Sequence, residues 1–219
     1  MDMSVAAPAV IPQTAATKVH RRPEVSKPAM VALKPGRRAE NQVTVSRQEI
    51  TDLIKATSTE VDASLPEAMR ILMSRAVVDT ILNRKASGLF GDTVTAIVNQ
   101  PWAFSAISSN LPYAYGTVGK MPDSAIKPLV RKDAETWLKA RAAGVPAQES
   151  GLNFANPFFS SERSKRQWVN EVVREAEASG HVYGDISRRS VHYHGTAPGL
   201  RGQEPKPYTI VLPDGWSPR

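Results

Sequence analysis

The spacing of apolar residues predicts a first helix that ends near Glu60. Its apolar positions are Ile50, Leu53, Ile54 and Thr57. They share one helical face, which is the pattern of a helix that packs against a core. Ser46 precedes the segment and Glu49 follows three residues later, so the two side chains can form a capping box. The folded part of the chain is therefore expected to begin near Ser46.

A second helix is expected to begin at Pro66, which suits a first helical turn, and to end at Gly88. Its apolar positions are Ala68, Met69, Ile71, Leu72, Met73, Ala76, Val77, Val78, Ile81 and Leu82. This apolar stripe is wider than the apolar face of a helix that has one side exposed to solvent. Its breadth therefore predicts a central helix.

Three further helices are expected along the chain. The first is short and covers residues 92–99. The second is stopped by Gly144, and the third begins at Ser160 or Ser161 and stops at Gly180. Their apolar faces are Val130, Ala134, Trp137 and Leu138 in the second, and Trp168, Val169, Val172, Val173 and Ala176 in the third. Both tryptophans are therefore expected in the core.

Irregular arms are expected on both sides of this helical region. Residues 1–45 are rich in Pro and Ala and keep no helical or strand period, so they are expected to be disordered or extended. Residues 188–219 contain five prolines, and only 208–212 has the pattern of a strand. The sequence thus predicts a mainly α fold. It consists of one helical domain over residues 46–187 and a C-terminal arm with at most short β structure.

The net charge of +7 lies mostly near the N-terminus. Residues 1–48 contain eight Lys and Arg against three Asp and Glu, a net charge of +5, which leaves +2 for the remainder. A basic arm can bind an anionic wall polymer or DNA, or dock onto a larger assembly. Because no aromatic residue interleaves these charges, stacking on nucleic-acid bases is not supported, and DNA is an unlikely partner.

Composition excludes several other classes of protein. The chain has no cysteine, so neither a disulfide framework nor thiolate chemistry is available. It also has no run of eighteen apolar residues, which a membrane-spanning helix needs. The first residues carry an acid and two prolines where a secretory signal is basic and apolar, so no such signal is predicted.

Two ordered blocks of motifs point to a known family. The first block runs from Leu53 to Ile107. It contains Leu53 seven residues before Glu60, then Leu82-Asn83-Arg84, Ser87-Gly88-Leu89-Phe90-Gly91-Asp92-Thr93-Val94 and Pro101-Trp102-Ala103-Phe104-Ser105-Ala106-Ile107. The second contains Gly151-Leu152-Asn153-Phe154-Ala155-Asn156-Pro157, then Trp168 and Gly180-His181-Val182-Tyr183. Together the blocks resemble the spore-cortex-lytic type of cell-wall hydrolase, which occurs in bacteria and phages.

The resemblance implies a lysozyme-like fold with Glu60 as the catalytic acid of a peptidoglycan glycosidase. Such an enzyme cleaves the bond between N-acetylmuramic acid and N-acetylglucosamine, and it needs no metal or cofactor. Lytic transglycosylases use a single carboxylate, whereas a muramidase uses two. Asp62 is the nearby second carboxylate, but residues two apart on a helix do not face each other. We therefore favour the transglycosylase over the muramidase, with Glu67 as the rival acid.

The same motifs suggest which side chains line a sugar groove. The candidates for substrate binding are Asn83, Phe104, Ser105, Asn153 and Phe154. Alternatively, Asn83 and Arg84 form a polar network at the end of their helix, and the two phenylalanines pack in the core. His192 and His194 would share a face of a strand, but no third metal ligand is evident, so a surface loop is expected there.

Departures from the family pattern support a second hypothesis. Its Glu-Ala-Arg-Gly-Glu segment is replaced by residues 60–64, its Gln before Phe-Ser by Ala103, and the Pro of its turn by Gly91. The alternative is therefore a structural or assembly protein of a virion that keeps the hydrolase fold with little activity. In both cases the expected setting is a virion, or the cytoplasm until release to the wall. The peptidoglycan glycan strand is the expected substrate, and residues 1–45 and 188–219 are the expected contacts with assembly partners.

Overall fold

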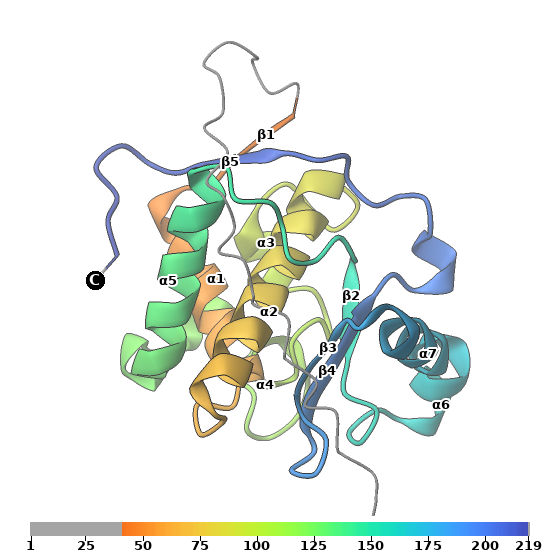
Figure 1. Ribbon diagram of the computed structural model, residues 1–219. Coiled ribbons are helices and arrows are strands. Elements are labelled where there is room, and N and C mark those ends of the chain that lie inside the picture. The colour runs from red at the N-terminus through yellow and green to blue at the C-terminus, as the bar shows by residue number, and fades with distance from the viewer. Residues whose placement is uncertain (1–40, 219) are drawn as a thin grey trace, which may run out of the picture. The chain divides into compact units, whose positions relative to one another are not determined.

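A computed structural model of the chain describes residues 41–218, and about half of them are helical (Figure 1). The mainly α fold expected from the sequence is therefore confirmed. Most of the predicted N-terminal arm, residues 1–40, lies outside the described residues. Its last part forms strand β1 (Gln42–Thr44), which pairs in parallel with β5 (Thr209–Val211).

The structure has helical segments at each of the five predicted positions, and a further short helix that was not predicted. They are α1 (Arg47–Glu60), α2 (Glu67–Ser87), α3 (Val94–Val98), α4 (Ser105–Ser108), α5 (Pro128–Ala142), α6 (Glu162–Ser164) and α7 (Asn170–Ser179). Short 3-10 turns cover Val118–Lys120, Asp123–Ala125 and Pro198–Leu200. No helix in the described part of the chain is long and apolar enough to cross a membrane.

Caps explain where the first two helices begin and end. Ser46 accepts a hydrogen bond from the Glu49 N–H, and Glu49 accepts one from the Ser46 N–H, so the predicted capping box is present. Gly88 ends α2 in the left-handed conformation, with φ 69°, which a residue with a side chain adopts only under strain.

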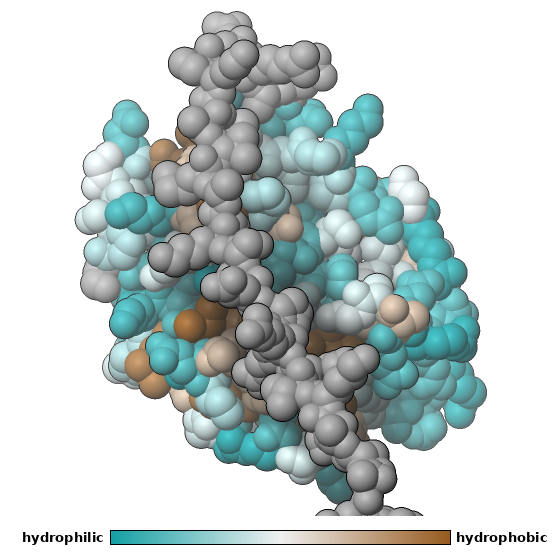
Figure 2. Space-filling view, in the orientation of Figure 1, coloured by the Kyte–Doolittle hydropathy of each residue, from teal (hydrophilic) through white to brown (hydrophobic). Residues whose placement is uncertain are grey.

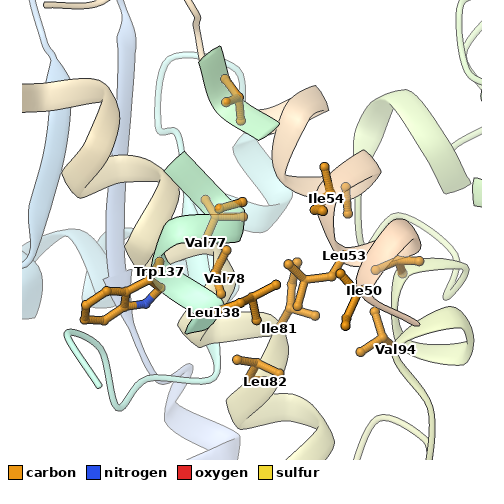
Figure 3. Packing of buried hydrophobic residues seen from close by; sticks show 14 of the residues in the cluster. Ile50, Leu53, Ile54, Val77, Val78, Ile81, Leu82, Val94, Trp137 and Leu138 are labelled. Carbon is orange, nitrogen blue, oxygen red and sulfur yellow. The ribbon is translucent and has the colours of Figure 1, made fainter. Parts of the chain in front are cut away.

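The core forms where α1 and α5 pack against α2 (Figure 3). The buried side chains in that view are Ile50, Leu53 and Ile54 of α1, Val77, Val78, Ile81 and Leu82 of α2, Val94 of α3, and Trp137 and Leu138 of α5. The wide stripe of α2 is explained by its position between these helices and the sheet (Figure 1). Trp137 is buried as expected, whereas Trp168 is only half-buried.

Apolar side chains also reach the surface at the starts of α2 and α5. Met69, Leu72 and Leu129 are exposed there. Hydrophobic side chains gather over this end of the two helices on an otherwise largely hydrophilic face (Figure 2).

The second sheet is antiparallel and has the order β2 (Asn153–Ala155), β4 (Ser190–Gly195), β3 (Val182–Asp185). Strand β4 is the central one, with Phe154 opposite His194 and Tyr183 opposite His192. The expectation of a surface loop at the two histidines was therefore wrong. The predicted domain end at residue 187 falls inside the β3–β4 turn, so residues beyond it belong to the sheet. The histidines made the strand look polar, but their rings are buried.

The helix that was predicted from Ser160 or Ser161 to Gly180 also differs from its prediction. It starts after the cap Ser161 and ends at Gly180 as expected. Between α6 and α7, however, residues Lys165–Val169 form a π-helical segment. The apolar spacing alone does not show this change of helix type.

A buried carboxylate joins α2 to α5 and to the segment before β2. Asp79 is fully buried and accepts hydrogen bonds from Trp137 Nε1 at 3.0 Å, Arg141 Nε at 3.1 Å and the Gln148 N–H at 2.7 Å. Burial raises the pKa of Asp79 to about 6, although Arg141 and these donors oppose the shift.

We expect Asp79→Ala to lower the free energy of unfolding by about 3–5 kcal/mol at pH 7.5, because it leaves Arg141 as a buried cation without its partner. Urea denaturation followed by circular dichroism measures this loss. Asp214→Ala, at an exposed position, is the control and should change stability by less than about 0.5 kcal/mol. A loss below about 1 kcal/mol in Asp79→Ala would contradict the structural role.

Candidate active site

Glu60 is the last residue of α1, and its side chain faces the three-stranded sheet. The helix ends because Val61 takes an extended conformation, with φ −94° and ψ 128°. The Glu60 side chain is 16% exposed, and its Oε2 lies 3.9 Å from His192 Nε2 on β4. Thr59 Oγ1 lies 3.5 Å from the other carboxylate oxygen. A carboxyl group is thus held between the end of a helix and the middle of a sheet.

Burial controls the ionisation of this group. It raises the pKa of the Glu60 carboxyl to about 7, while the hydrogen bond from Thr59 and the charges of Arg84 and Lys127 oppose the shift. Burial also lowers the pKa of Arg84 to about 10, and it lowers the pKa of Lys127. The loss of water around the carboxylate therefore outweighs two nearby positive charges.

His192 is a neutral neighbour of Glu60. Burial lowers the pKa of its imidazole to about 3, so the ring carries no charge at neutral pH. The 3.9 Å separation is also too long for a hydrogen bond, so the contact is not an ion pair. Nδ1 of this ring is buried and has no hydrogen-bond partner among the described residues.

Aromatic side chains form the wall behind His192. The ring of Phe154 on β2 stacks on His192 at 4.6 Å and on His194 at 5.2 Å. Phe104, which is almost fully buried, lies 6.1 Å from Phe154. The Arg84 guanidinium lies 5.8 Å from the centre of the Phe104 ring. The wall therefore comes from three segments that are distant in the sequence.

The end of α2 holds the sheet in position next to Glu60. Asn83 donates hydrogen bonds to the carbonyls of Glu149 and Gly151, and its side-chain oxygen accepts one from Tyr208. Arg84 Nε donates to the Leu152 carbonyl at 2.7 Å. Asn83 is therefore a structural residue whose polar atoms are occupied, as the polar-network alternative proposed.

The remaining predicted residues have different positions. Ser105 is exposed at the start of α4, beside Phe104. Asn153 begins β2, and its Oδ1 accepts a hydrogen bond from the Ala197 N–H at 3.0 Å. The structure therefore brings Phe104 and Phe154 to the Glu60 site, while Asn153 fastens β2 to the segment after β4.

The rival carboxylates are engaged elsewhere or exposed. Asp62 accepts hydrogen bonds from the Ser64 N–H at 2.9 Å and the Ser64 hydroxyl at 2.7 Å, which hold its pKa below the usual range. The Arg188 guanidinium lies 3.6 Å from the other oxygen of Asp62. Glu67 is exposed at the start of α2. Neither replaces Glu60 as the buried acid.

A second buried carboxylate was missed by the sequence analysis. Glu149 is 1% exposed and accepts hydrogen bonds from the Tyr183 hydroxyl and from His181 Nδ1, the latter at 2.9 Å. Burial raises the pKa of Glu149, and burial together with the hydrogen bond to Glu149 raises the pKa of the Tyr183 hydroxyl. These contacts join β3 to the segment before β2. Glu149 stands in a loop and belongs to no motif, so the sequence pattern does not single it out.

Two cavities lie away from Glu60. One of about 570 Å³ is lined by the end of α7, His181, Thr196 and Arg201, and another of about 100 Å³ lies near Arg47 and Trp216. Among residues 41–218, no three His, Asp or Glu side chains form a group that could hold a metal ion.

Comparison of the chain with models of protein families, with curated proteins and with solved structures gave no match.

Glu60→Gln should be more stable than the wild type above pH 7. The folded carboxyl keeps its proton up to about pH 7, against 4.5 as the ordinary value. Its contribution to stability is therefore complete below about pH 4.5 and is lost as the pH rises through about 7. Since glutamine resembles the protonated acid, we expect a gain of about 3 kcal/mol at pH 8 and almost none at pH 4.

Urea denaturation of both proteins between pH 4 and pH 8 measures this difference. Glu67→Gln is the matched control, because it makes the same change at an exposed position, and its stability should follow that of the wild type. Parallel curves for Glu60→Gln and the wild type across this range would show that Glu60 is not a desolvated acid.

Proposed function

We propose that the chain is a peptidoglycan glycosidase that cleaves the bond between N-acetylmuramic acid and N-acetylglucosamine, and that Glu60 is its catalytic residue. The observation that carries the proposal is a desolvated carboxyl with a pKa near 7 at the end of a helix, facing an aromatic-lined sheet. The helical domain with its small sheet supports a lysozyme-like arrangement. The motifs around Glu60 and Phe154 support the same family.

The first step needs a proton at the leaving oxygen of the glycosidic bond. A carboxyl whose pKa lies near the working pH is partly protonated and transfers its proton efficiently. The positive charges of Arg84 and Lys127 act to lower the pKa of Glu60 and so favour its ionised form. They therefore stabilise the carboxylate that forms when the proton leaves.

The second step favours a lytic transglycosylase. Asp62 is bound by Ser64 and Arg188, and His192 has a pKa of about 3, so neither is suited to activate a water molecule. In a transglycosylase the C6 hydroxyl of the muramic residue attacks the anomeric carbon. Glu60, now a carboxylate, accepts the hydroxyl proton, and a 1,6-anhydro ring forms. One carboxyl group thus serves both steps.

Two positions are suited to contact the sugar. The Phe154 ring is half-buried beside His192, and Ser105 is exposed beside Phe104. Phe104 is almost fully buried and supports the Phe154 ring from behind. We assign substrate contact to Phe154 and Ser105, and structural support to Phe104 and Asn83.

A second candidate function is favoured by the limited access to Glu60. Its side chain is 16% exposed, and Arg188 joins the 62–64 loop to the β3–β4 turn close by. An assembly protein of a virion that retains the fold would tolerate such a closed site. The basic, Pro- and Ala-rich sequence of residues 1–45 suits a phage or virion-associated protein under either function.

Digestion of purified peptidoglycan tests the proposal. We expect wild type to release soluble fragments with 1,6-anhydro-muramic ends, detected by mass spectrometry. Glu60→Gln should lower the rate by about a hundredfold to ten-thousandfold, because it cannot transfer a proton. Glu67→Gln should retain the wild-type rate.

Other products lead to other conclusions. Reducing muramic ends would replace the transglycosylase by a muramidase. If folded wild-type protein releases no fragments, the assembly function is favoured.

The dependence of rate on pH separates one catalytic carboxyl from two. With Glu60 acting alone, kcat/KM should be level at low pH and fall about tenfold per pH unit above about 7, where the acid loses its proton. A second carboxylate would add a fall on the acid side and give a bell-shaped profile. Initial rates of fragment release between pH 4 and pH 9 distinguish the two shapes.

A further inference from the structure

Three large apolar side chains are exposed at one end of the three-stranded sheet. Phe158 is 44% exposed, Phe159 is 76% exposed and Ile186 is 54% exposed. The two phenylalanines follow β2, and Ile186 begins the turn between β3 and β4, which lies at the same end of the sheet (Figure 1). We call these three residues the aromatic platform. Exposed apolar groups gathered in this way are typical of a binding surface.

Hydrogen bonds fix the backbone that carries the platform. Asn156 accepts a hydrogen bond from the Phe158 N–H at 3.1 Å through its side chain, and it accepts one from the Phe159 N–H at 3.2 Å through its carbonyl. The amide of Asn156 also donates to the Arg189 carbonyl at 2.8 Å, so the turn after β2 is tied to the β3–β4 turn. The exposure of the rings is therefore part of an ordered turn.

Contacts of neighbouring residues link the platform to the Glu60 site. Arg189 lies 5.8 Å from the centre of the Phe158 ring. Its neighbour Arg188 donates hydrogen bonds to the carbonyl and hydroxyl of Ser64, which is four residues after Glu60. On the other side, Phe154 is four residues before Phe158 and stacks on His192. Two separate routes thus connect the platform to the acid.

The chemistry of the platform suits a sugar polymer with acidic substituents. Aromatic faces bind the apolar faces of pyranose rings, and a flat exposed phenylalanine offers such a face. Arg188 and Arg189 are exposed beside it, and both attract carboxylates. Peptidoglycan combines pyranose rings with the carboxylates of its stem peptides, and it extends well beyond the bond that is cut.

We propose that the aromatic platform binds the peptidoglycan glycan strand beyond the scissile bond, with Phe159 stacking on a sugar ring and Arg189 facing the stem-peptide carboxylates. This inference rests on the proposed function of the Glu60 site. It adds the surface that holds the polymer while the bond is cut.

Binding to purified peptidoglycan, measured by co-sedimentation of the full chain, tests the platform. All proteins carry Glu60→Gln, so that turnover does not affect the result. We expect Phe159→Ala to raise Kd by about tenfold, because a stacking partner is lost, and Phe159→Tyr to leave Kd unchanged. Leu129→Ala is the matched control, since it removes an exposed apolar side chain at the start of α5.

Each outcome supports or overturns the proposal. Equal Kd values for the parent and Phe159→Ala would overturn it, as would equal losses in Phe159→Ala and Leu129→Ala. A dimer in sedimentation equilibrium that Phe159→Ala converts to a monomer would overturn it in favour of self-association. Failure of the proposed function has a different signature. In that case protein without Glu60→Gln releases no fragments, whereas binding still depends on Phe159.

Discussion

The polar side chains on the buried edge of α2 are the constraint on which the rest of the structure depends. Asp79, Asn83 and Arg84 are all buried, and each forms hydrogen bonds with the segment from Gln148 to Leu152. That segment leads into β2 and has no strand partner of its own, so its backbone groups need partners from elsewhere. A central helix supplies them with its polar side chains while its apolar side chains build the core. These hydrogen bonds fix the three-stranded sheet against α2.

The position of the sheet has an electrostatic consequence for α1. Strand β4 places the neutral imidazole of His192 next to the last residue of the helix, and the Phe154 ring stacks on that imidazole. Glu60 therefore loses hydration without gaining a strong hydrogen-bond partner, and burial prevails over the charges of Arg84 and Lys127. Stability and the proposed chemistry oppose each other at this position. Burial makes the Glu60 carboxyl suited to transfer a proton, but ionisation of the same buried carboxyl lowers the stability of the fold.

The sequence predictions succeeded where the signal came from neighbouring residues, and they failed where a feature depends on distant ones. The capping box at Ser46 and Glu49 and the stop at Gly88 depend on neighbouring residues, and the structure confirms them. Strand β4 was missed because it contains buried histidines and depends on two partner strands. Asn83 was found by its motif, but its role depends on carbonyls more than sixty residues away. The further a partner lies along the chain, the less the sequence shows of it.

The sequence by itself determined that the chain is mainly helical and that a carboxylate ends the first helix. These properties follow from local spacing and from residue type. Only the tertiary structure decided that Glu60 is desolvated, that His192 is its neighbour and that Asp62 is engaged elsewhere. The physical reason is that a pKa depends on the solvent, charges and donors around a group, and distant segments supply these only once the chain has folded.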